Sequence, residues 1–355
     1  MSDSFGELFD GVARRLITLF GPWSQQVEQM AWTLEDPINL LKAHNVNGSI
    51  SVHAANQNWV TVDAWKTVRA PSEGGAAAFA RRVRVRLTQR KHGIYLHAVY
   101  PHPPLGYSVF VRYEITVPRA IDMDLYTQNG GITVGGVEGA LEAETRTGNI
   151  YLNDTLGPVT LYTAEGDIRV ADVDGTVDAE SSSGAVRLHN VSGVARLRTT
   201  SGPIVLNVGE GVVRARSFRG DVELQHFKGR AEGQTISGDI KVSFARLRES
   251  SEFITQDGSI DLVIQDVAED ATALEAEALE GDINLAIVPD ASGLLDAGAG
   301  AGSVHCHLPV SGGQKSKHLL VGQLGEGKTP LIKLRTFEGD ITIRPYEASD
   351  ESLDS

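Results

Sequence analysis

The sequence has very little cysteine, since Cys306 stands alone in 355 residues. A single thiol excludes a disulfide framework within the chain and suits a reducing compartment. No apolar run approaches the roughly 20 residues that a membrane-spanning helix requires. The first residues carry Asp3, Glu7 and Asp10 where a signal peptide would have a basic region. We therefore predict a cytoplasmic protein without a signal peptide or transmembrane segment.

Basic residues are also scarce. The chain has 32 lysines and arginines against 46 aspartates and glutamates, which gives a formal net charge of −14. The phosphates of a nucleic acid would be repelled by such a surface, so we expect no sequence-independent nucleic-acid binding.

Glycine, in contrast, is abundant and periodic, because thirteen glycines recur at every ninth position from Gly130 to Gly238. The shared pattern is glycine, any residue, apolar, polar, apolar, and this alternation is typical of short strands. Every second nonapeptide carries a hydroxyl residue at its seventh position, so the true repeat has 18 residues. The hydroxyl residues are Thr145, Thr163, Ser181, Thr199, Ser217 and Thr235.

An 18-residue unit of two strands cannot bury a face alone, but stacked units can. We therefore predict an all-β fold, a parallel β-solenoid or β-helix with 18-residue, two-strand coils and a short helical N-terminal cap. The hydroxyl column should point inward and bond a neighbouring backbone group. Glycines should mark the corners, where φ is positive or backbones approach closely. The glycines predicted as structural corners are Gly130, Gly148, Gly166, Gly184, Gly202, Gly220 and Gly238.

The chain divides into four predicted parts. Residues 1–43 form a helical segment, with apolar residues at helical spacing over 5–20 and a second short helix over Ser24–Leu34. An irregular β section covers 44–120, the solenoid covers 121–346 with an insertion near 307–333, and 347–355 form a disordered acidic tail. The predicted strands of the β section are Ser49–His53, Trp59–Trp65, Val83–Gln89, Ile94–Tyr100 and Ser108–Val117.

A series of related motifs runs through the chain: NGSISV, YEITVP, NGGITV, TGNIYL, EGDIRV, SGDIKV and a closing EGDITI. With this series, residues 44–346 resemble the bacterial putative-adhesin family, a domain of unknown function built as a β-solenoid. The resemblance implies a non-enzymatic protein, often linked to the cell envelope. It supplies no catalytic residues to carry over.

Three sequence patterns resemble sites that bind phosphate, calcium or another metal ion, and each of them is incomplete. Residues 322–329, GQLGEGKT, match a phosphate-binding loop, but Pro330 and a strand-like segment follow where a helix is needed, so we predict a turn. The nonapeptides lack the aspartate that calcium-binding β-rolls carry at position 6. His305 and His307 flank Cys306 and could bind a metal ion with His318, but no further ligand converges there. We predict no catalytic residue, metal or cofactor.

Charged residues on the coils have two interpretations each. Seven arginines form a candidate surface for an anion or a partner, or else a solvated or neutralised face. They are Arg82, Arg84 and Arg86 on one predicted strand, and Arg196, Arg198, Arg214 and Arg216 on two successive coils. Five aspartates follow corner glycines and should accept backbone N–H bonds, the alternative being a carboxylate pair of a polysaccharide-cleaving β-helix. These are Asp167, Asp221, Asp239, Asp282 and Asp340.

Three functional hypotheses follow. The first is a structural or interaction scaffold that binds a protein or envelope partner or associates with itself through open strand edges. The second is a carbohydrate-binding or carbohydrate-active β-helix, for which Tyr151 and Tyr162 are the main outward aromatics. The third is an envelope-stress accessory protein that acts peripherally at the membrane surface through residues 5–20.

Overall fold

The computed structural model describes residues 15–19, 24–267 and 273–347. Strands dominate these residues, and they fall into two compact units, Met1–Asp174 (unit 1) and Gly175–Ser355 (unit 2). Each unit is described by itself.

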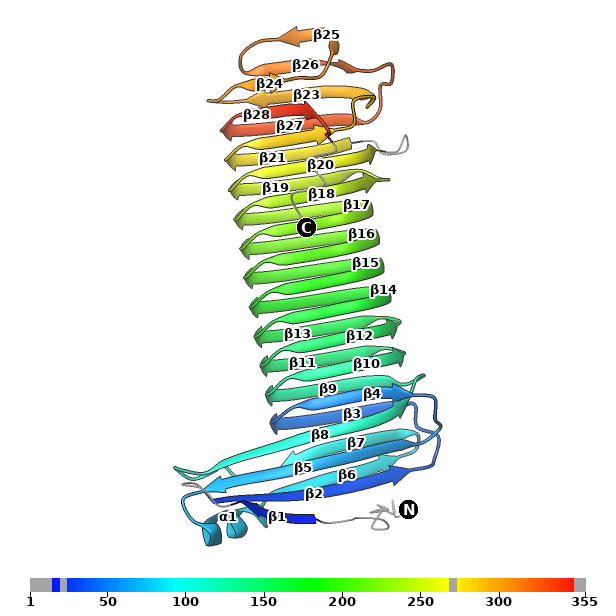
Figure 1. The fold of residues 1–355 in the computed structure, drawn as a ribbon, viewed down its shortest axis with the longest axis vertical. Coiled ribbons are helices and arrows are strands. Elements are labelled where there is room, and N and C mark those ends of the chain that lie inside the picture. The colour runs from blue at the N-terminus through cyan, green and yellow to red at the C-terminus, as the bar shows by residue number, and fades with distance from the viewer. Residues whose placement is uncertain (1–14, 20–23, 268–272, 348–355) are drawn as a thin grey trace, which may run out of the picture. The chain divides into compact units, whose positions relative to one another are not determined.

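Unit 1 combines parallel coils with antiparallel strands (Figure 1). One parallel sheet runs β4–β10–β12–β14 and the other runs β3–β9–β11–β13. The first continues through β8, β5, β2 and β1, and the second through β7 and β6. The strands are β1 (Arg15–Leu19), β2 (Ser24–Leu34), β3 (Leu40–Asn47), β4 (Ile50–Ala55), β5 (Val60–Ala70), β6 (Arg84–Arg90), β7 (Gly93–Val99), β8 (Ser108–Pro118), β9 (Asp122–Asn129), β10 (Ile132–Glu138), β11 (Leu141–Thr147), β12 (Ile150–Leu156), β13 (Val159–Glu165) and β14 (Ile168–Ser183), whose residues from Gly175 onward belong to unit 2.

In unit 2, three strands of 16 residues each wrap a whole coil, and shorter strands follow. They are β15 (Val186–Ser201), β16 (Ile204–Arg219), β17 (Val222–Ser237), β18 (Ile240–Leu247), β19 (Ser251–Asp257), β20 (Ile260–Val267), β21 (Ala273–Glu280), β22 (Ile283–Ile287), β23 (Gly293–Ala299), β24 (Val304–Cys306), β25 (Val310–Lys315), β26 (Leu319–Leu324), β27 (Leu331–Glu338) and β28 (Ile341–Pro345).

The stacking order of unit 2 departs from the chain order at its end. The coil of β27 and β28 pairs on one side with β21 and β22 and on the other with β23 and β24. The predicted insertion contains β25 and β26, which form an antiparallel hairpin, and β26 also pairs with β23.

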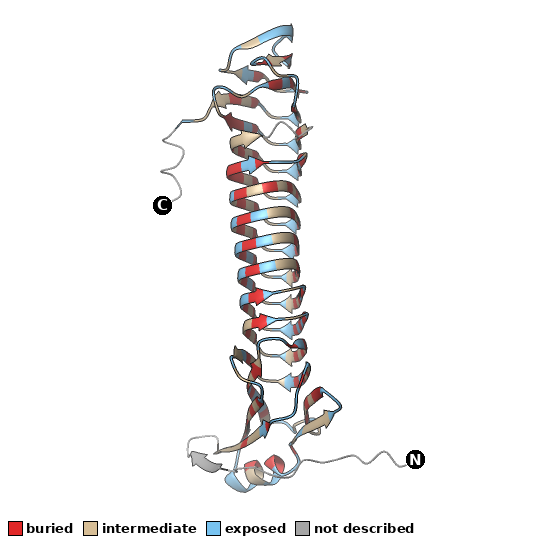
Figure 2. Cartoon of the chain, turned by 90° about the vertical axis from the view of Figure 1, so that its right-hand side faces the viewer, coloured by how far each residue is buried: buried red, intermediate tan, exposed pale blue. Residues whose placement is uncertain are grey.

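The first coils are in exact register, so identical positions stack, whereas the pairing of β18 with β20 contains register shifts between Val242 and Arg246. Ile132 lies opposite Ile150, and Ile150 lies opposite Ile168, and all three are at most 1% exposed. Buried and exposed residues alternate along the strands (Figure 2), as expected for a core between two sheets. The all-β parallel solenoid with an 18-residue coil is therefore confirmed.

The corner glycines leave no room for a side chain. Gly148 has φ +150°, and a Cβ atom there would lie 2.1 Å from the carbonyl oxygen of Gly130 in the preceding coil. The neighbouring hydroxyl column is buried, and Thr163 Oγ1 donates to the Gly148 carbonyl oxygen at 3.0 Å. Thr145, Thr199, Ser217 and Thr235 make the same bond to the glycine fifteen residues earlier, at 2.9–3.5 Å, and Ser181 is buried in the same column.

The prediction of an N-terminal helical cap is wrong where the structure describes it. Residues Ser24–Leu34 form strand β2, which pairs antiparallel with β5 over eleven residues, and Arg15–Leu19 form β1. Pairing over the whole length of β5 outweighs the weak local helical spacing. The remainder of 5–20 and most of the predicted acidic tail lie outside the described residues. No helix among the described residues is long and apolar enough to cross a membrane.

The only α-helix of the described chain, α1 (Glu73–Ala80), lies between the predicted strands Trp59–Trp65 and Val83–Gln89. It packs against β5 and β2. Below its C-terminus the buried Lys66 Nζ donates to the carbonyl oxygens of Ala80 and Val83 and forms an ion pair with Glu28 at 2.8 Å. The ammonium group thus bonds one carbonyl at the helix end, that of Ala80, and one in the segment that follows, that of Val83.

Candidate binding groove

The arginines of unit 2 are only partly neutralised. Arg198 contacts Asp178 at 3.1 Å in the same unit, and Arg214 contacts Glu232 at 2.9 Å. Arg196 and Arg216 stack on Arg214 and Arg198 in the strand register, and within the described residues neither forms an ion pair. Ion pairs therefore neutralise two of these four arginines.

The arginine strand of unit 1 is an edge strand, because β6 pairs with β7 alone among the described strands. Arg84 and Arg86 are exposed and form no ion pair within the described residues. Arg82 precedes the strand, and its guanidinium lies 5.4 Å from the Phe79 ring centroid. Charged side chains on an edge strand oppose pairing with another strand, which gives this group a structural role.

The remaining patterns have structural explanations. Strand β27 rather than a helix follows the glycine-rich turn at 322–329, so the turn lacks the helix that phosphate binding needs. His305 bonds Ser303, and His318 bonds the Gly302 carbonyl. No group of three or more His, Cys, Asp or Glu that could hold a metal ion is found in the part of the chain that the structure describes.

The corner aspartates of unit 2 accept backbone N–H bonds from the next coil. Asp221 accepts from Asp239 at 2.9 Å, Asp239 from Ser259 at 2.8 Å, and Asp282 from Asp340 at 2.8 Å. Asp340 accepts from both the hydroxyl and the backbone N–H of Ser303, and these bonds hold its pKa below the ordinary value. Each carboxylate thus closes a corner between coils.

The second corner of the coil has a feature that the glycine pattern did not indicate. One residue there adopts the left-handed region in seven successive coils, at φ +51° to +76°. Going along the chain, the residues in this column are Gly136, Asp154, Asp172, Asn190, Val208, His226 and Phe244. Glycine, aspartate, asparagine and histidine tolerate this conformation, but a β-branched or bulky residue is a true outlier. Val208 and Phe244 are therefore strained.

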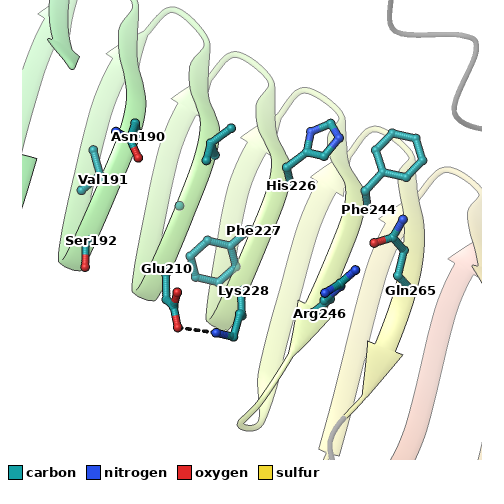
Figure 3. A pocket seen from close by; sticks show the side chains of 12 residues that line it. Asn190, Val191, Ser192, Glu210, His226, Phe227, Lys228, Phe244, Arg246 and Gln265 are labelled. Atoms are coloured by element: carbon teal, nitrogen blue, oxygen red, sulfur yellow. Dashed lines mark hydrogen bonds and ion pairs between the residues drawn. The ribbon is translucent and has the colours of Figure 1, made fainter. Parts of the chain in front are cut away.

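Val208, His226 and Phe244 line a groove in unit 2 with a volume of about 390 Å³ (Figure 3). The His226 and Phe244 rings lie 5.1 Å apart, and Val208 is 44% exposed. Phe227 forms part of the floor, and Gly209 beside it leaves room for the ring, since a Cβ atom there would lie 3.2 Å from Phe227 Cδ2.

Cationic side chains line the opposite wall of the groove (Figure 3). Lys228 is paired with Glu210 at 2.6 Å. Arg246 lies opposite Asp266 in the strand register, but the ion pair of Asp266 is with Arg248 at 3.5 Å. Arg246 forms no ion pair within the described chain. An apolar and aromatic wall facing a cation suits a ligand with apolar groups and a carboxylate.

Comparison with known proteins gives similarities to solved structures only. No protein-family model matches the sequence, and no curated protein matches it. A putative adhesin from Bacteroides fragilis is 12% identical, with 90% of this chain and 97% of that chain covered and a TM-score of 0.31. A putative cell adhesion protein from Clostridium sporogenes (9% identity, 90% and 100% covered, TM-score 0.18) and a putative lipid binding protein from Parabacteroides distasonis (9%, 90% and 97%, TM-score 0.28) are also similar. The function is therefore argued below from this chain's residues alone.

Proposed function

We propose that this chain is a non-enzymatic β-solenoid scaffold that binds a protein partner, and that the groove beside Val208, His226 and Phe244 is the binding site. The observation that carries the proposal is the left-handed column. Two coils hold residues there that the backbone disfavours, Val208 and Phe244, whereas earlier coils hold Asp154 and Asn190. Backbone strain of this kind gathers at functional sites, because selection for folding alone would remove it.

The size and chemistry of the groove support an extended peptide as the ligand. The groove touches five successive coils, from Asn190 to Gln265, which span about 19 Å at the spacing of sheet strands. Five or six extended residues have about this length. Apolar side chains of the peptide would contact Val208 and His226, and a carboxylate would bind Arg246.

Selection of a displayed random-peptide library on the full-length chain tests this proposal. The expected peptides carry a carboxylate beside apolar residues. Their affinity should fall about tenfold in Arg246→Ala and in His226→Asn, as for the loss of one charged or one aromatic anchor. Arg216→Ala, an exposed arginine outside the groove, is the matched control.

Two results would contradict the proposal. One is a selection that yields no peptide, or peptides that bind the groove variants and the wild type equally. The other is binding of the chain to a glycan array that depends on His226, which would instead support the carbohydrate-binding alternative. Because the motif resemblance points to envelope-linked relatives, bacterial envelope proteins that contain the selected peptide sequence are the first natural partners to test.

A further inference from the structure

A second surface of unit 2 exposes large apolar side chains in a single column. The column follows the buried hydroxyl column by one residue, and five coils contribute to it in stacking order. Its members are Phe218, Ile236, Gln256, Leu279 and Phe337, which we call the apolar stripe. The four apolar side chains are 47%, 39%, 51% and 61% exposed in this order.

The solenoid itself does not require apolar residues in this column. The equivalent coils of unit 1 carry Gln128, Arg146 and Ala164 at the same position, one residue after Thr127, Thr145 and Thr163. A stacked row of exposed phenylalanine, isoleucine and leucine costs solvation free energy that a polar row would not. The stripe is therefore suited to contact with another molecule.

Carboxylates lie along one side of the stripe. In the four coils that follow the coil of Phe218 they stand one or three residues after the stripe, and we call them the acidic border: Asp239, Asp257, Glu280, Asp282, Glu338 and Asp340. In the coil of Phe218 the first of these positions holds Arg219, whose guanidinium lies 5.6 Å from the Phe218 ring centroid. All six carboxylates are exposed. None of them forms an ion pair with a lysine or arginine among the described residues. The glutamates Glu280 and Glu338 stack directly on one another in the strand register, so their charges repel and a bound cation would relieve this repulsion.

We propose that the apolar stripe and the acidic border together bind a cationic amphipathic helix of a partner protein. Five coils at the spacing of sheet strands extend about 19 Å, the length of a helix of about 13 residues. The apolar ridge of a helix advances about 5.4 Å per turn, close to the coil spacing of about 4.8 Å. One face of an extended strand advances about 6.7 Å and loses register sooner. Lysine or arginine beside the ridge would reach the acidic border.

The same charges argue against other occupants. An anionic membrane surface or a nucleic acid would be repelled by the acidic border. A second copy that placed the same stripe against this one would bring two acidic borders together. The ligand is also opposite in charge to the acidic peptide proposed for the groove, so the two surfaces can be tested independently.

Binding of a synthetic peptide to the full-length chain tests this inference. The peptide has about 14 residues, with leucine along one helical face and lysine beside it. We expect saturable binding by fluorescence anisotropy, a gain of peptide helicity in circular dichroism, and weaker binding as salt rises. Phe337→Ser and Leu279→Ser should each weaken binding at least about fivefold, and Glu280→Gln with Glu338→Gln should reduce the salt dependence.

Leu156→Ser provides the matched control, because Leu156 is 52% exposed in unit 1 and lies outside the stripe. Circular dichroism of each variant checks that the solenoid is intact. The inference is overturned if the peptide does not bind, if a peptide of the same composition with scrambled order binds equally, or if Leu156→Ser weakens binding as much as Phe337→Ser. Equal or stronger binding of anionic lipid vesicles at the same residues would overturn it as well.

Discussion

Val208 has a β-branched side chain at φ +58°, where an L-residue other than glycine, asparagine or aspartate loses about 1–2 kcal/mol. Because the side chain is 44% exposed, little buried apolar contact is lost on its replacement. We therefore expect Val208→Asn to stabilise the chain by about 1 kcal/mol. The measurement is the midpoint of urea unfolding followed by circular dichroism.

Val205→Asn is the control for this prediction, since Val205 lies in the same strand, is half-buried and has no positive φ. There the same substitution should destabilise slightly, because asparagine is a poor strand former. A destabilising effect of similar size at both positions would contradict the assignment of strain to Val208.

A second residue-scale prediction concerns His97 on β7. Burial, the positive charge of Arg86 and that of His44 together lower the His97 pKa from its ordinary value of 6.5. Since the unfolded chain then binds the proton more readily, His97 contributes a loss of stability as pH falls below 6.5 and no pH dependence above it. Arg86→Gln should raise the His97 pKa, as measured by NMR titration of the imidazole, and should weaken this acid-side loss.

Arg84→Gln removes the same charge two residues away on β6, opposite Val99 rather than His97. It should leave the His97 titration nearly unchanged. Equal shifts in the two variants would indicate a general effect of net charge instead of the local one.

The sequence predicts some columns of the solenoid and not others, and the difference is physical. At the corner only glycine fits, and at the buried position beside it a small hydroxyl residue fits best. These residue types therefore recur along the repeat, and the pattern can be read from the sequence. The left-handed column also recurs, as Asp154, Asp172 and Asn190, but Val208 and His226 then break the pattern. Only the backbone angles join them into one column, and so the groove could not be predicted.

At the scale of elements, the N-terminal strands show that the local spacing of apolar residues does not by itself decide between helix and strand. The segment Ser24–Leu34 has apolar residues that suit a short helix, yet each of its residues pairs with β5. A partner strand some 30 to 40 residues later in the chain decides the conformation, and local sequence carries no sign of it. The five strands predicted between 49 and 117 are present as β4 to β8, because their alternation is itself the sheet signal.

The junction between α1 and the sheet depends on a buried charge. Lys66 is 5% exposed, and the side chain of its ion-pair partner Glu28 is 17% exposed. Lys66→Met leaves Glu28 as an uncompensated, half-buried charge and removes the hydrogen bonds to the Ala80 and Val83 carbonyls, so we expect a loss of about 3 kcal/mol, the lower end for breaking a buried pair. The double variant Lys66→Met with Glu28→Gln should lose clearly less than the single lysine variant, because no unpaired charge remains.

Urea unfolding of the two single variants and the double variant gives the coupling free energy directly. Additive losses in this cycle would show that Lys66 acts through packing or through the carbonyl bonds alone, and not through its pairing with Glu28.

At the scale of the whole molecule, the order of coils is the part that sequence could not supply. The motif around Thr336–Ile341 predicts a coil with the same corner as its neighbours, and the structure has one there. Because the corners of the coils are alike, however, the corner sequence does not determine which coil stacks on which. That β27 lies between β21 and β23 depends on the hairpin of β25 and β26, which carries the chain back past an earlier coil.

A solenoid must also prevent its edge strands from pairing with other copies. In unit 1 the edge strand β6 carries Arg84 and Arg86, and in unit 2 the edge strand β25 contains a register shift between Ser311 and Gln314. Charges and bulges of this kind oppose strand addition. They argue against self-association through open edges in the wild type.

Arg84→Thr with Arg86→Thr removes the charges from β6 and substitutes a good strand former, so the free N–H and C=O groups of this edge can pair with a second copy. We expect light scattering after size exclusion to show a monomer for the wild type and concentration-dependent oligomers for this variant. Arg196→Thr with Arg216→Thr makes the same change of net charge on strands that already have a partner on each side, and should remain monomeric. If both variants form oligomers, the effect is due to lost charge repulsion between molecules and not to the β6 edge. If the β6 variant stays monomeric, the edge is protected by something other than its arginines.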